Sequence, residues 1–156
     1  MSATVTDEQS AARDLVRSWA AASGAIDAVR EVEHDPAAWR APYLAFAELG
    51  IFGVAVPEES GGAGSSVEDL CAMIDEAAAA LVPGPVATTA LATLLVTDPG
   101  LLDALMSGQR TAGVALSSDD AVDGNRASGT ADHVLGADAA GVLVLRVGDA
   151  VVLIDA

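Results

Sequence analysis

The hydrophobic period of this 156-residue chain changes once, near Thr111. Before that point, apolar residues recur every three or four positions, as they do along one face of an α-helix. After it they form short runs, and two of these, residues 142–145 and 151–154, flank a Gly-Asp pair in the manner of a β-hairpin. We therefore expect an α+β fold, with an all-α domain over residues 1–109 and a partial antiparallel β domain over residues 110–156.

Two capping boxes predict helix starts in the first part. Thr6 and Gln9 have the required spacing, in which a hydroxyl and an amide satisfy the unpaired backbone N–H groups of a first turn. Ser65 and Glu68 repeat this spacing before residues 67–81, which carry the most regular helical pattern in the chain. The single cysteine, Cys71, falls on the apolar face of that helix, so we expect a buried and inert thiol.

Further helices are expected where apolar residues recur at helical spacing. Asp98 followed by proline is a typical helix start, because the carboxylate caps and proline tolerates the first helical position. The helix predicted over residues 86–96 is apolar on nearly every face and should be buried. These helices are expected over residues 26–33, 42–49, 86–96 and 99–108, with Trp19, Trp39, Tyr43 and Phe46 as core anchors.

The charge excludes several classes of partner. The formal net charge is -16, with seven arginines and no lysine. Such a chain repels phosphate backbones and anionic lipids, so neither nucleic acid nor a membrane is an expected partner. No segment is long and apolar enough to span a membrane, the first residues do not resemble a signal peptide, and we expect a cytoplasmic protein.

Metal and disulfide chemistry are also not expected. One cysteine excludes an intramolecular disulfide and a cysteine-based zinc site. His34 and His133 have no second metal-ligating residue at useful spacing and are expected at the surface.

The glycine-rich segment LGIFGVAVPEESGGAG, residues 49–64, stands between two helices. Glycines before a helix start can approach a phosphate closely. This loop, however, lacks the dinucleotide-binding spacing and carries Glu58 and Glu59, which we interpret as solvated or helix-capping acids. We expect a structural turn that joins two helices, with Gly62 selected for a positive φ.

The order L-G-x-x-G-x-x-x-P-E-E-x-G-G-x-G in this segment resembles the signature in the N-terminal helical domain of acyl-CoA dehydrogenases. The spacing also agrees at Pro83-x-Pro85, around residues 108–116 and at residues 137–140. The resemblance covers nearly all of the chain but less than half of a typical member. It implies FAD as cofactor and an acyl-CoA as substrate.

The resemblance also implies site residues. The family's first β-domain strand ends in a motif like A-L-T-E-P-x-A-G-S-D, whose threonine and neighbouring backbone contact the flavin. The matching positions make Val114, Leu116 and Ser117 candidate FAD-binding residues. The Glu-Pro and Gly-Ser-Asp parts are absent, and residues 127–135 lack the family's W-I-T segment.

Thr88, Thr89 and Leu91 match the family's helix that lines the acyl tunnel, which makes them candidate substrate-binding residues. Plain interior packing, with the threonine hydroxyls bonded back to the preceding turn, is an equally open alternative.

The family chemistry is α,β-desaturation of a thioester. A carboxylate removes the α-proton while the flavin accepts the β-hydrogen as hydride. In the family that base lies in a C-terminal domain that this sequence lacks, so we assign no catalytic residue and do not expect the chain to catalyse alone.

Three hypotheses follow. The chain is a partner subunit, in a homo- or hetero-oligomer with an acyl-CoA dehydrogenase subunit. Alternatively it is a non-enzymatic helical interaction or scaffold domain from a decayed or split gene, or a fragment of a longer reading frame. The open edge of the few expected strands predicts pairing with another chain.

Overall fold

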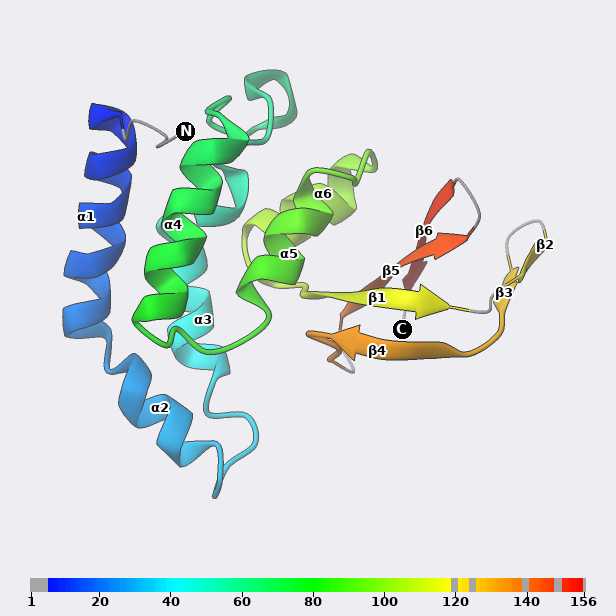
Figure 1. Cartoon of the computed structure of the whole chain (residues 1–156), viewed down its shortest axis with the longest axis horizontal. Helices are drawn as coiled ribbons and strands as arrows, with labels where there is room; N and C mark the ends of the chain where they lie inside the picture. The colour runs from blue at the N-terminus through cyan, green and yellow to red at the C-terminus, as the bar shows by residue number, and fades with distance from the viewer. Residues whose placement is uncertain (1–5, 119–120, 124–125, 139–140, 148–149, 156) are drawn as a thin grey trace, which may run out of the picture.

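The computed structural model describes residues 6–118, 121–123, 126–138, 141–147 and 150–155. Helices form one end of the molecule and strands the other (Figure 1). The helical elements are α1 (Asp7–Ser23), α2 (Ala25–Glu31), α3 (Arg40–Ala47), the short 3-10 turns η1 (Ile51–Gly53) and η2 (Glu58–Ser60), α4 (Val67–Ala79), α5 (Val86–Thr93) and α6 (Pro99–Met106).

The strands form a sheet in the order β4-β1-β5-β6 and a separate β2-β3 hairpin. The α+β architecture is confirmed, but the sheet is mixed, because β1 pairs with β5 in parallel. β4 lies antiparallel on one edge of β1, so a chain that reverses again to reach the other edge must run parallel to β1. The strands are β1 (Ala112–Ser118), β2 (Ala121–Asp123), β3 (Arg126–Ser128), β4 (Ala131–Leu135), β5 (Val142–Val147) and β6 (Ala150–Asp155).

The expected hairpin forms, since β5 pairs with β6 antiparallel. β2 and β3 form a second antiparallel pair. The turn residues of both hairpins lie outside the described residues. The division at Gln109 stays a prediction; the last helix ends at Met106 and the first strand begins at Ala112.

α1 and α4 lie side by side (Figure 1) and are joined by ion pairs as well as by packing. Arg17 forms two hydrogen bonds of 2.9 Å with the Glu76 carboxylate, and the pKa of Arg17 is raised by this contact. Arg13 lies 2.7 Å from Asp75. Beneath these pairs, Val16 packs in the core with Leu70 and other buried residues of the helical part.

The helix starts are largely as expected. The Thr6–Gln9 capping box is present, and Asp98 accepts a 2.8 Å hydrogen bond from the Leu101 N–H group. The second box is shifted by one residue, since Ser66 and Asp69 exchange the capping hydrogen bonds and α4 begins at Val67.

The prediction for Cys71 was wrong, because its side chain is exposed. The buried positions of α4 are Leu70, Ala72, Met73 and Ala77, which places Cys71 beside the inward face and not on it.

Two other helices differ from expectation. α3 begins at Arg40, which leaves Pro42 in the first turn, where a missing N–H group costs little. α5 ends at Thr93 and is not buried all round, since Leu91 is 42% exposed.

The glycine-rich segment is a structural turn, as expected, but Gly62 is required for another reason. Its φ is not positive; instead, a Cβ atom at this position would collide with the carbonyl oxygen of Val56. The approach is held by hydrogen bonds from Ala63 to Gly53 and from Gly64 to Val56, of 2.9 and 2.8 Å. Close packing of two backbone segments therefore selects the glycine.

Replacing Gly62 with alanine should destabilise the fold by about 2–3 kcal/mol, because the added methyl group overpacks the turn. Gly50 is the matched control: its φ is +79° with open space around it, so Gly50→Ala should cost only about 1 kcal/mol. Urea denaturation measures both. Equal losses would show that the contact with Val56 does not matter.

Candidate functional site

Thr89 lies at the centre of the junction between the helices and the sheet. Its side chain is fully buried, and its Oγ1 accepts hydrogen bonds from the Tyr43 hydroxyl at 3.0 Å and from the Ala112 N–H group at 3.1 Å. One threonine on α5 thus joins α3 to the first residue of β1. A buried N–H group left without such a partner would be costly, so this contact orients the sheet on the helices.

The other two predicted substrate-binding residues lie in different surroundings. Thr88 is half-buried, and its hydroxyl donates a 3.2 Å hydrogen bond to the Pro85 carbonyl, three residues earlier in the chain. Leu91 is exposed on α5, and Leu94 and Leu95, which follow the end of this helix, are exposed as well. The structure therefore does not bring Thr88, Thr89 and Leu91 into one cavity.

The predicted flavin-binding residues all lie on β1. Val114 is half-buried and packs against the core cluster that includes Leu102 and Leu105 of α6. Leu116 and Ser117 are placed by their backbone only, and their side chains lie outside what the structure describes. Ser117 pairs with Asp132 of β4.

The two edges of β1 differ in length of pairing. β4 pairs with β1 as far as Ser118, whereas the pairing of β5 with β1 extends only to Val114, opposite Val144. Among the described strands, β5 thus leaves the carboxyl half of β1 open on one edge. Main-chain N–H and C=O groups that face this edge are candidates for binding a ligand.

A second contact between the two parts of the chain was not anticipated from the sequence. Arg40 Nη2 lies 2.7 Å from Asp138 Oδ2, and the Thr111 hydroxyl donates to the same oxygen at 3.3 Å. The Arg40 guanidinium also lies over the Trp39 ring, 4.8 Å from its centroid. No sequence pattern indicates a pair separated by so much chain.

Tyr43 is buried near both the Thr89 hydrogen bonds and the Arg40–Asp138 pair. Burial raises the pKa of its hydroxyl to about 12; the hydrogen bond to Thr89 opposes the shift and the negative charge of Asp138 adds to it. The phenol is therefore neutral under ordinary conditions. Its ring lies against Phe52 and Trp39, with centroid distances of 5.4 Å in both cases.

The described part of the chain contains no group of three or more His, Cys, Asp or Glu side chains arranged to hold a metal ion. His34, His133, Glu58 and Glu59 are all exposed, as expected. No helix among the described residues is long and apolar enough to cross a membrane.

The sequence matches the family described as "Acyl-CoA dehydrogenase, N-terminal domain" over residues 6–104. This match covers more than half of the chain, which therefore belongs to the acyl-CoA dehydrogenase family. The resemblance in the glycine-rich segment and the expected fold are both confirmed by this assignment.

Individual relatives agree with the family. The chain is 57% identical over 166 aligned residues to acyl-CoA dehydrogenase FadE34 of Mycobacterium tuberculosis, across 99% of this chain and 23% of FadE34. It is 28% identical to acyl-CoA dehydrogenase IpdE2 of Mycolicibacterium smegmatis, across 86% of this chain and 43% of that protein.

Solved structures are similar as well. One is titled a Tcur3481-Tcur3483 steroid ACAD G363A variant, with a TM-score of 0.72 and 27% identity, covering 97% of this chain and 49% of the other. The ChsE4-ChsE5 complex of Mycobacterium tuberculosis shares the fold, with a TM-score of 0.61, 21% identity and 48% of that chain covered. The chain spans less than half the length of each of these relatives.

Removing the Thr89 hydroxyl should weaken the junction. Thr89→Val leaves the Tyr43 hydroxyl and the Ala112 N–H group without an acceptor, and should cost about 3 kcal/mol of unfolding free energy. Thr88→Val removes only a local hydrogen bond and should cost less than about 1 kcal/mol. Similar losses in chemical denaturation would contradict the bridging role.

The protein should lose stability on the order of 2 kcal/mol as the pH rises from about 10 to about 12. The unfolded chain releases the tyrosine proton first, near pH 10, whereas the folded chain holds it to about pH 12. The chain has no lysine and no second tyrosine, so Tyr43→Phe should abolish most of this loss. An unchanged pH dependence in Tyr43→Phe would refute the assignment.

Proposed function

We propose that this chain forms part of an FAD-dependent acyl-CoA dehydrogenase, which introduces an α,β double bond into an acyl-CoA thioester. The proposal is supported by the family assignment and by the 57% identity to FadE34. It concerns an assembly, because the relatives are at least about twice as long as this chain.

The observation that carries the cofactor assignment is the open edge at the carboxyl end of β1. The pairing with β5 stops at Val114, and the candidate residues Leu116 and Ser117 follow directly. A flavin ring carries hydrogen-bonding groups along one edge, and those main-chain groups of this segment that face away from β4 would suit them. FAD, when bound, supplies the acceptor for the hydride.

Val114 would act differently from its two neighbours. Its side chain packs against the α6 cluster, so we propose that it supports the flavin-binding segment from behind. Ser117 would add a hydroxyl where the family's motif has threonine. The remaining side chains of a flavin site, and the base that removes the α-proton, would come from outside this chain.

For the substrate, α5 is the proposed surface. Leu91 is exposed and Thr88 is half-buried on neighbouring turns, while Thr89 holds the helix in place. A steroid-linked acyl-CoA is the substrate to test first, because one solved relative is titled a steroid ACAD.

A homo- or hetero-oligomer with an acyl-CoA dehydrogenase subunit is the proposed assembly. Both solved relatives are titled as pairs of differently named chains. Such a partner would bring the T-E-P, W-I-T and base-bearing segments.

A second candidate function is a non-enzymatic interaction or scaffold domain. It is favoured by residues 117–120 and 127–135, which depart from the family's flavin-binding motifs. In that case the chain would assemble with its partner without contacting the cofactor.

The test is co-purification of this chain with the partner subunit, followed by flavin absorbance and titration with FAD. Ser117→Ala should weaken FAD binding about five- to tenfold through loss of one hydrogen bond, and Ser117→Thr should retain it. Ser128→Ala, on the exposed β3 strand, is the control.

Two results decide between the candidates. A flavin that binds only when both chains are present and responds to Ser117→Ala supports the enzyme. A stable complex supports the scaffold function if its flavin content does not depend on this chain and does not change in the Ser117 variants.

A further inference from the structure

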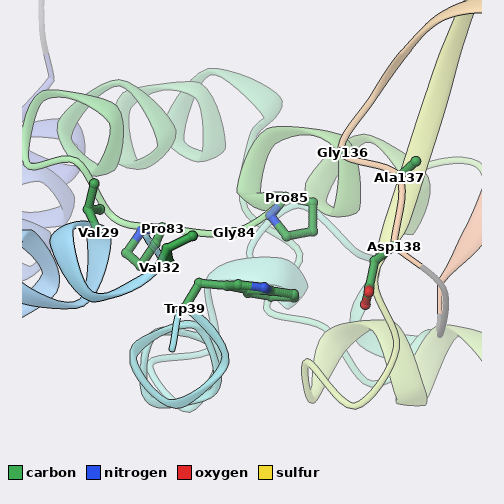
Figure 2. A pocket seen from close by; sticks show the side chains of 9 residues that line it. All are labelled: Val29, Val32, Trp39, Pro83, Gly84, Pro85, Gly136, Ala137 and Asp138. Atoms are coloured by element: carbon green, nitrogen blue, oxygen red, sulfur yellow. The ribbon is translucent and has the colours of Figure 1, made fainter. Parts of the chain in front are cut away.

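A pocket of about 420 Å3 opens between the helical part and the sheet. Figure 2 shows Val29 and Val32 on one side of it, Asp138 on the other and the Trp39 indole between them. The full lining consists of Val29, Val32, Trp39, Pro83, Gly84, Pro85, Gly136, Ala137 and Asp138. Most of this wall is apolar, and its one charged group is a carboxylate.

The walls are closely packed. Gly84 has a φ of +96° and lies so close to the rings that a Cβ atom there would be 2.7 Å from Tyr43 and 2.8 Å from Trp39. Prolines stand on both sides of it. Trp39 is fixed by its edge contact with Tyr43 and by Arg40 over its face. A preformed pocket of this kind loses little conformational entropy when a ligand binds.

The polar end is equally well positioned. Asp138 accepts from Arg40 and Thr111, and both contacts use Oδ2. Its side chain is 18% exposed, and none of the described residues donates a hydrogen bond to Oδ1. A ligand that offers an O–H or N–H group at this end would form a charge-assisted hydrogen bond.

The size of the pocket limits the ligand. An apolar cavity of about 150 Å3 holds benzene. A pocket of 420 Å3 therefore has room for two or three fused rings. The mostly apolar lining, with the Trp39 indole at its centre, favours an apolar ring system.

We propose that this pocket binds a flat apolar molecule of two or three fused rings that carries a hydroxyl or N–H donor directed at Asp138. The site differs from the proposed flavin-binding segment. It adjoins Thr111, which directly precedes β1, whereas Ser117 lies about 20 Å further along the chain. The lining includes none of Thr88, Thr89 and Leu91.

The probe is 2-naphthol, which has two fused rings and one hydroxyl donor, and the control ligand is 2-methoxynaphthalene, which has no donor. The full chain is labelled with 5-fluorotryptophan and followed by fluorine NMR. The Trp39 resonance should shift saturably, and that of Trp19, on α1 and outside the pocket, should not. 2-Naphthol should bind about tenfold more tightly than its methyl ether.

A pair of variants locates the site without disturbing the core. Val29→Trp fills the pocket from an exposed position and should weaken binding at least tenfold. Ile26→Trp adds the same side chain to the same helix outside the lining and should leave binding unchanged. Circular dichroism confirms that both variants fold.

Three results would overturn the proposal: no saturable shift of Trp39, equal affinity for the two ligands, or equal loss in the two variants.

Discussion

The structure depends on one buried hydroxyl. Thr89 accepts a hydrogen bond from the helical part, through Tyr43, and another from the sheet, through Ala112. The residue stands on a short helix that is enclosed on one side only, so the orientation of α5 relative to β1 rests on this point. The Arg40–Asp138 contact adds a second link between the same two parts of the chain, beside the pocket at Trp39.

A second constraint is the distribution of charge. The chain has few cations for its many acids, and most of its described ion pairs place an arginine where two elements meet. Arg13 and Arg17 hold α1 on α4, and Arg40 holds the loop after β4. Arg13, Arg17 and Arg40 therefore stabilise contacts between elements, which leaves few cations for binding an anionic ligand.

Local features could be predicted from the sequence, and distant contacts could not. The caps at Thr6 and Asp98 were correct because each depends on three neighbouring residues. The box at Ser65 was one residue off because Ser65-Ser66 and Glu68-Asp69 offer two equivalent pairs. The glycine-rich segment carried the family, yet Gly62 proved to be selected by contact with Val56, which no local pattern reveals. No sequence pattern predicted the Arg40–Asp138 pair, because the two residues come together only when the sheet packs against the helices.

The position of β1 in the mixed sheet also governs the order of folding. β1 is made before either of its neighbours, and its parallel partner, β5, comes only after the β2-β3 hairpin and β4. Closing that long loop has an entropic cost that must be met before the strand pairs form. During synthesis the helices and their aromatic cluster are complete before the sheet. β1 therefore remains without its neighbouring strands until the later residues have been made.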